Sequence, residues 1–131
     1  MVQNRFILDS NLLLAHYIKN DTTRNASFAL FERIGGSEMI IPYCVIEEVS
    51  TILTYKVGKK TAEDFLNDVQ AVENIFIVND NVEKEIEYFK SIRQKISFTD
   101  AALLYLSKIY QAALVTFDQQ LFRLYKKAEF C

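Results

Sequence analysis

Four acidic residues stand in short motifs where a carboxylate could do chemistry. They are Asp9 in FILDSN, Glu48 in PYCVIEEV, Asp100 in SFTDAALL and Asp118 in VTFDQQ. If these side chains meet in the folded chain they repel one another, because two like charges about 4 Å apart cost about 4 kcal/mol at a typical effective dielectric constant. Such a cluster must take up protons or bind a cation. Carboxylate oxygens suit hard cations, so the pattern indicates a Mg²⁺ or Mn²⁺ site that could hydrolyse a phosphodiester.

Each of these acids also has a purely structural interpretation. Asp9 and Asp118 follow short apolar segments and could cap the helices that begin there, which stabilises a helix by about 1 kcal/mol. Asp100 could be a first-turn acid that interacts favourably with the helix dipole. Glu48 could be an ordinary solvated helix residue. Only their convergence in the fold would favour the metal site.

Helix geometry distinguishes Glu48 from its neighbour Glu47. At about 100° per residue, four apolar side chains of the predicted helix form one stripe: Val45, Val49, Ile52 and Leu53. Glu48 falls at the edge of this stripe, where it can lean toward a site at the end of a sheet. Glu47 points nearly opposite the stripe, so we expect it to face water.

Short apolar segments alternate with longer amphipathic segments along the chain. The sequence predicts strands at 5–8, 39–41, 75–78 and 113–116, and helices at 12–18, 22–34, 43–56, 60–73, 80–95, 99–110 and from 118 onward. Thr99 and either Asn79 or Asp80 are expected to cap their helices. This alternation is typical of a mainly parallel sheet covered on both faces, an α/β/α sandwich with four or five short strands. Ligands of such sheets bind beyond the carboxyl ends of the strands, where Asp9 and Asp118 stand.

The composition is that of one globular domain spanning residues 1–131. Half of the residues are hydrophobic, and three glycines and one proline are too few for many tight turns. The net charge of −2 does not favour nucleic-acid binding unless the acids cluster and bind cations. Two cysteines, Cys44 and Cys131, provide no disulfide framework, which fits a reducing cytoplasm. No run of about 18 apolar residues predicts a membrane span.

In their order along the chain, the four acidic motifs resemble those of the PIN-domain family, particularly the VapC-type toxins of prokaryotic toxin–antitoxin pairs. LDSN resembles the family's Asp-Ser/Thr-Asn after the first strand, and the segment 41–53 resembles the helix that carries its glutamate, here Glu48. The segment 98–101 resembles its Asp-Ala at the start of a late helix, and 116–118 its closing Thr-x-Asp. The likeness spans nearly the whole chain. It departs at the end, where the chain stops soon after the last helix and the family's final edge strand is short or missing.

The resemblance implies a PIN-like fold and a metal-dependent endoribonuclease. The four acids would hold one or two Mg²⁺ or Mn²⁺ ions, and RNA would be hydrolysed without a covalent enzyme intermediate. Asn11, Ser10 and Thr116 would orient these carboxylates by hydrogen bonding, although Ser10 could equally be a turn residue. The family also implies an antitoxin protein that occludes the site, and a homodimer.

Other features of the sequence leave alternatives open. Two loose groups of basic residues could contact RNA phosphates or form plain surface: Lys56, Lys59 and Lys60, and Arg93 and Lys95. A catalytically inactive PIN fold could bind RNA or a partner without cleaving it. A receiver-like phosphoacceptor domain is also a parallel sheet with acids at strand ends. It needs paired acids after the first strand, whereas Asp9 stands alone.

Overall fold

The computed structural model describes residues 4–129, and side chains as far as residue 127. Within this part of the chain the elements, in order, are β1 (Arg5–Leu8), α1 (Ser10–Tyr17), α2 (Arg24–Ile34), β2 (Glu38–Pro42), α3 (Tyr43–Lys56), α4 (Lys59–Ala71), β3 (Ile75–Val78), α5 (Val82–Ser91), α6 (Phe98–Ile109), β4 (Ala113–Val115) and α7 (Gln119–Glu129). Cys131 lies outside the described residues. The predicted alternation of strands and helices is confirmed.

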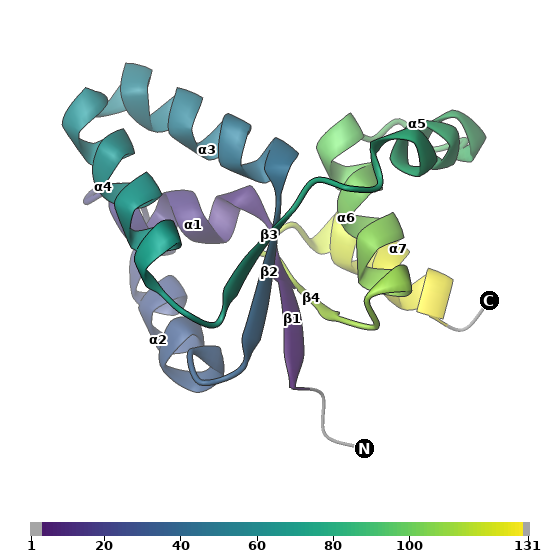
Figure 1. Ribbon diagram of the computed structural model, residues 1–131, viewed down its shortest axis with the longest axis horizontal. Coiled ribbons are helices and arrows are strands. Elements are labelled where there is room, and N and C mark those ends of the chain that lie inside the picture. Colours follow the sequence, from purple (N-terminus) through teal and green to yellow (C-terminus); the bar gives the residue numbers. More distant parts are fainter. Residues whose placement is uncertain (1–3, 130–131) are drawn as a thin grey trace.

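The four strands form one parallel sheet in the order β3-β2-β1-β4. Helices α1 to α4 cover one face of the sheet and α5 to α7 the other, so the predicted three-layer α/β/α sandwich is confirmed (Figure 1). The strands β1 and β2 lie in the middle and are buried by both layers, with Ile7, Leu8 and Ile41 inaccessible to solvent. In the described residues no fifth strand follows α7, and β4 is therefore an edge strand.

Except for α3, the helices begin one or two residues away from their predicted starts, and three of these differences have a clear local description. The helix α6 begins at Phe98 and its cap is Ser97, not Thr99, because the Ser97 hydroxyl oxygen accepts a hydrogen bond from the Asp100 N–H at 3.0 Å. The helix α5 follows Asn81 and ends at Ser91, shorter than predicted. The helix α1 begins at Ser10, because the Asp9 carboxylate accepts from the Ser10 N–H and starts the helix two residues early. No helix in the described part of the chain has the length and apolarity to cross a membrane.

Candidate acidic site at the carboxyl end of the sheet

Asp9 is fixed where β1 ends beside β4. Its N–H donates to the Val115 carbonyl at 3.1 Å and so continues the pairing of the two strands by one residue. Its Oδ1 accepts from the Ser10 N–H at 2.7 Å, and its Oδ2 accepts from the Thr116 hydroxyl at 2.7 Å. The side chain is only 5% exposed. Both carboxylate oxygens therefore have neutral donors and a defined orientation.

Thr116 joins the turn after β1 to the turn after β4. Besides donating to Asp9, its hydroxyl oxygen accepts from the Asp118 N–H at 2.9 Å and lies 3.3 Å from Asn11 Nδ2, which donates to it. Asn11 Oδ1 in turn accepts from the Phe117 N–H at 3.2 Å. The exposed Asp118 carboxylate accepts from the N–H at the third position of α7, at 3.0 Å, and caps that helix. One hydrogen-bond network thus positions Asp9 and Asp118 relative to each other.

Two helices present the other acids of the site. On α3, the buried stripe of Val45, Val49 and Leu53 packs into the core, which leaves Glu48 half-buried at its edge. Glu47 is exposed, as the helix geometry predicts. Asp100 lies in the first turn of α6 and is also half-buried.

Three of the four acids have a pKa that is raised in part by the charges of the others. Burial raises the pKa of Asp9, and the charge of Asp118 adds to this effect, although the hydrogen bonds to Asp9 oppose it. Burial and then the charges of Asp9 and Asp100 raise the pKa of Glu48. Burial and then the charges of Asp9 and Asp118 raise the pKa of Asp100. Residues that are remote in the sequence therefore share one electrostatic environment.

The donor chemistry of this environment suits a hard divalent cation, but the side chains are not drawn together around one. Between residues 4 and 127, no group of three or more Asp, Glu, His or Cys side chains has the spacing of a metal centre. Both oxygens of Asp9 are held by hydrogen bonds from Ser10 and Thr116. None of the ion pairs formed among the described residues includes one of the four acids. Among the described residues, Asp9 and Asp118 are therefore held by neutral hydrogen-bond donors and not by a positive side chain.

Thr99 is a site residue that the sequence interpretation missed, because it was assigned to the helix cap. Hydrogen bonds with its side chain favour the ionised forms of both Glu48 and Cys44. Ser10 acts in the same way on Glu48. The signal was present in the sequence, since Ser97-Phe98-Thr99-Asp100 has the Ser-x-x-acid spacing of a capping box, which leaves Thr99 inside the first turn.

The basic residues predicted to contact RNA occupy two separate places. Lys56, Lys59 and Lys60 surround the turn between α3 and α4, whereas Arg93 and Lys95 lie between α5 and α6. These two places are on opposite sides of the sheet (Figure 1). Lys60 Nζ lies 2.7 Å from a carboxylate oxygen of Asp64, and Lys59 Nζ lies 4.0 Å from one of Glu63. The structure therefore does not gather these residues into one basic surface.

The fold and the acids together define a class of protein: a parallel three-layer α/β domain with carboxylates where the central strands end. The model of the PIN domain family matches residues 6–127, and the chain belongs to this family. The fold is similar to that of Mycobacterium tuberculosis VapC20, a sarcin–ricin loop cleaving toxin, with a TM-score of 0.74 and 16% sequence identity over 88% of this chain and 92% of that chain. No curated protein gives a match.

Proposed function

We propose that this protein is a metal-dependent endoribonuclease and the toxin of a type II toxin–antitoxin pair. The observation that carries the proposal is an electrostatic effect between acids from four separate segments of the chain. The charge of Asp9 raises the pKa of Glu48 and of Asp100, and the charge of Asp118 raises the pKa of Asp9 and of Asp100. Buried like charges without a counter-cation destabilise a fold, so stability does not explain why these acids lie near one another. A cation-binding role does explain it. Membership of the PIN domain family and the likeness in fold to VapC20 support RNA as the substrate.

In this proposal the four acids hold Mg²⁺ or Mn²⁺. When bound, the ion would neutralise their charge, polarise the RNA phosphate and help activate water. The chain's own contribution is to keep the carboxylates ionised and oriented, because only the ionised form binds a cation. Thr116 and the Ser10 N–H orient Asp9, and the Ser10 and Thr99 hydroxyls favour ionised Glu48. Asn11 holds the turn that carries Thr116 and Asp118.

The partners and the setting follow from the same proposal. Residues 1–131 would act as one domain in the cytoplasm, with an antitoxin protein that occludes the acidic site. Exposed lysines and arginines, of which Lys56 and Arg93 are examples, would contact RNA phosphates beyond the metal. The ion itself would offset the net charge of −2 that otherwise repels RNA.

A homodimer is also part of the proposal, and α5 offers a surface for it. Val82, Ile86 and Phe89 follow one another at helical spacing and are 44%, 37% and 39% exposed. Phe98 packs against Phe89 at a ring-centroid distance of 5.6 Å and extends this stripe. Sedimentation of the purified chain should show a dimer, and Ile86→Lys should shift it to a monomer. A monomer in the unmodified chain would remove the homodimer from the proposal.

The decisive experiment is cleavage of a sarcin–ricin loop RNA and of a single-stranded RNA, each with Mg²⁺, with Mn²⁺ and with EDTA. We expect cleavage with either metal, none with EDTA, and none by Asp9→Asn or Asp100→Asn. The matched control is Asp64→Asn, which removes a carboxylate from the exposed face of α4 and should cleave normally. Cleavage that survives both EDTA and the two site substitutions would refute the proposal. RNA binding without cleavage in any metal would instead establish an inactive PIN module.

A further inference from the structure

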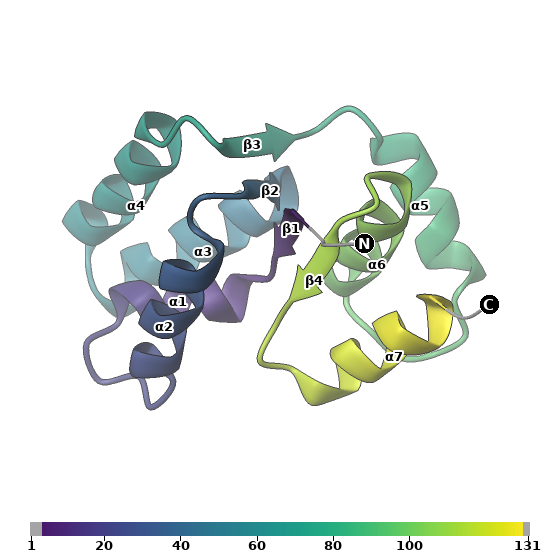
Figure 2. The ribbon, with the colours of Figure 1, turned by 90° about the horizontal axis from the view of Figure 1, so that it is seen from below.

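The strand β3 is an open edge of the sheet. Among residues 4–129 it pairs with β2 alone, and Figure 2 shows it as the outermost strand on its side of the molecule. The Met39 N–H donates to the Asn74 carbonyl at 2.8 Å, so Asn74 and Phe76 direct their backbone groups toward β2. Because alternate residues of a strand direct these groups to opposite sides, the N–H and C=O of Ile77 point away from the sheet. This edge can pair with a further strand.

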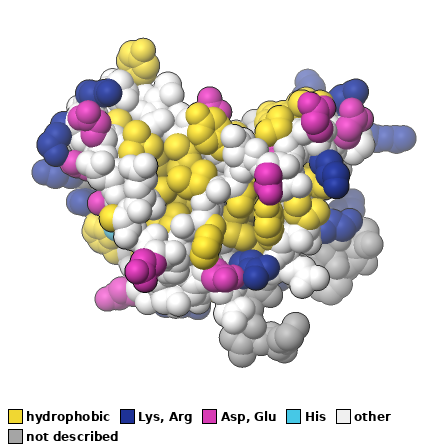
Figure 3. Space-filling view, viewed as in Figure 1, with side chains coloured by type: hydrophobic (Ala, Val, Ile, Leu, Met, Phe, Trp, Pro, Cys, Tyr) yellow, Lys and Arg dark blue, Asp and Glu magenta, His cyan; other side chains and the backbone are white. Residues whose placement is uncertain are grey.

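The edge is also apolar and unprotected. Phe76 and Ile77 are 47% and 45% exposed, and β3 carries no charge, proline or bulge of the kind that usually blocks an edge strand. A groove of about 400 Å³ lies beside it, lined by Ile40, Phe76, Ile77 and Val78, by Tyr110, and by the ion-paired Arg5 and Glu38. In Figure 3, hydrophobic side chains gather in the middle of the face where β3 forms the front edge of the sheet. Side chains of an added strand would enter this groove.

The charge around the edge is negative. The segment from residue 61 to residue 83 contains six acids and no lysine or arginine. Lysines pair with Glu63 and Asp64 of α4. In contrast, Glu73, just before β3, and Asp80, just after it, are exposed and form no ion pair among the described residues. Each end of the strand therefore carries a negative charge.

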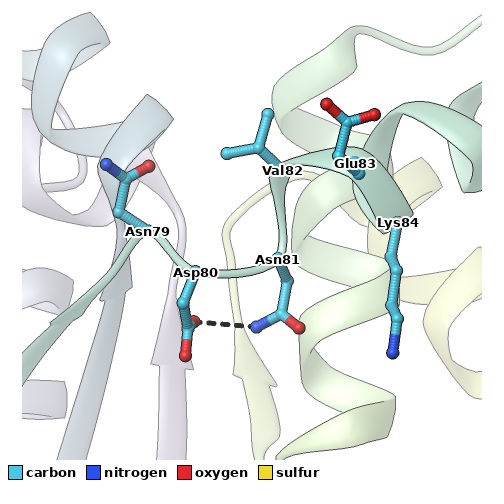
Figure 4. Close-up of a pocket in the computed structure, with 6 residues that line it drawn as sticks. All are labelled: Asn79, Asp80, Asn81, Val82, Glu83 and Lys84. Atoms are coloured by element: carbon cyan, nitrogen blue, oxygen red, sulfur yellow. Dashed lines mark hydrogen bonds between the residues drawn. The ribbon is translucent and has the colours of Figure 1, made fainter.

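The acid that follows β3 is held in place. Asp80 Oδ1 accepts from Asn81 Nδ2 at 2.8 Å and from the Tyr110 hydroxyl at 3.2 Å. Figure 4 shows the side chains of Asp80 and Asn81 on one side of the loop, while Glu83 points the other way and Lys84 borders the same hollow. The Tyr110 carbonyl accepts from Arg5 Nη1 at 2.9 Å, which fixes this wall of the groove to β1. The groove and its acidic end are therefore preformed.

We propose that the β3 edge binds an extended segment of a partner protein as an additional strand, and that this segment alternates apolar and basic residues. Backbone hydrogen bonds with Ile77 would provide affinity, and the groove would accept alternate side chains. Basic residues would meet Glu73 and Asp80. A second copy of this chain is a poorer occupant, because it would bring the same acids together at one seam without a counter-charge. RNA is repelled by the same acids.

The probe is a fluorescein-labelled nine-residue peptide that alternates valine and lysine, titrated against the full chain by fluorescence anisotropy. We expect saturable binding with a Kd below about 1 mM. Replacing the lysines of the peptide with glutamates, or introducing Phe76→Lys or the pair Glu73→Lys and Asp80→Lys in the protein, should weaken binding by about tenfold or more. The matched control is Tyr55→Lys, at an exposed aromatic residue on α3, which should bind like the unmodified chain.

Hydrogen exchange locates the peptide, and the Ile77 amide should exchange more slowly in the complex. Circular dichroism checks that each variant is folded, and the charge-reversed pair alters exposed side chains only, so it tests the idea even if Phe76→Lys unfolds. Asp9→Asn should bind the peptide normally, which separates this edge from the proposed nuclease site. The inference is overturned if the valine–lysine peptide does not bind, if the glutamate peptide binds equally well, or if protection falls on another element. Displacement of the peptide by RNA, or a dimer that Phe76→Lys disrupts, would also overturn it.

Discussion

Two groups of acids in this protein are placed in opposite ways. On α4, Glu63 and Asp64 each follow a lysine by four residues, at distances of 4.0 and 2.7 Å, and all four side chains are largely exposed. At the carboxyl end of the sheet, Asp9 is 5% exposed and its partners are an N–H and a hydroxyl rather than a cation. The first group is built like an ordinary helix surface. The second holds negative charge where it is costly.

The difference separates a contribution to stability from a candidate function. Exposed ion pairs such as those of α4 contribute little to stability and are screened by salt. Acids that are buried beside like charges oppose folding until they are protonated or bind a cation. Asp9, Glu48 and Asp100 all have a pKa raised first by burial. Counting acids would not distinguish the two groups, but their burial and their partners do.

The largest effect expected from this comparison is that of Asp9→Asn. RNA cleavage should fall by more than about 100-fold, because the loss of a ligand exceeds the 10–100-fold effect of an outer partner. Without metal, the Asp9→Asn variant should unfold at a higher urea concentration than the unmodified chain, because a buried charge has been removed. Asp64→Asn should leave cleavage unchanged and slightly lower the stability of the fold. Equal effects of the two substitutions in both assays would abolish the distinction.

A smaller loss is expected from Thr116→Val, which removes the hydroxyl between Asp9 and Asp118. Cleavage should fall by about 10–100-fold, because the carboxylate of Asp9 is no longer oriented. The Mg²⁺ concentration that gives half-maximal cleavage should rise with it. The control is Thr54→Val, whose hydroxyl donates to the Ser50 carbonyl within α3 and should not affect either value. A change in stability alone, with cleavage intact, would make Thr116 a purely structural residue.

Much of the fold could be predicted because local pattern and burial agree. Each of the four short apolar segments is a strand of the parallel sheet, and α3 has its predicted bounds. The stripe of α3 also placed Glu48 at the edge of the buried face and Glu47 toward water, since helix geometry alone decides this. Helix starts were less predictable, because Ser97, Thr99 and Asp100 can each stand near a helix N-terminus, although the Ser-x-x-acid spacing of Ser97 and Asp100 favours Ser97 as the cap.

The acidic site and the β3 edge show which features could not be predicted from the sequence alone. The topology places the ends of β1 and β4 together, so the approach of Asp9 and Asp118 follows from a parallel sheet. The role of Thr99 depends on how α6 meets α3, which no spacing in the sequence fixes. The segment Ile75–Val78 reads as a buried strand, yet it is an exposed edge, because strand order is a property of the whole sheet.

The pH dependence of stability tests whether burial and neighbouring charges raise the pKa values of the acids at the end of the sheet. Because the folded-state pKa values of Asp9, Glu48 and Asp100 are raised, the folded state binds more protons than the unfolded state between the ordinary and the raised values. Their contribution to stability is therefore complete below the ordinary pKa values of 3.8 and 4.5, and it is lost as the pH rises through the raised values.

Urea unfolding at several pH values, in EDTA and in Mg²⁺, measures this contribution. In EDTA the triple variant Asp9→Asn, Glu48→Gln, Asp100→Asn should gain stability over the unmodified chain as the pH rises. Mg²⁺ at about ten times its Kd should stabilise the unmodified chain by about 1.4 kcal/mol at neutral pH and leave the triple variant unchanged. Identical pH profiles of the two proteins in EDTA would mean that the acids do not interact in the folded chain.

The smallest effect on stability and on cleavage is expected from Glu85→Gln. This variant tests whether burial alone is enough to make an acid part of the site. Glu85 on α5 is 6% exposed, and burial and then the charge of Asp80 raise its pKa, so it shares the burial of the sheet-end acids without sharing their neighbours. The substitution should raise the free energy of unfolding at neutral pH by less than about 1 kcal/mol, with the gain vanishing as the pH falls and the carboxylate protonates. Cleavage should stay within about twofold of normal, since the charge that acts on Glu85 is that of Asp80 and not that of one of the four acids. If Glu85→Gln abolished cleavage as Asp9→Asn is expected to do, Glu85 would be a fifth acid of the site. The proposal that the site consists of four acids would then be wrong.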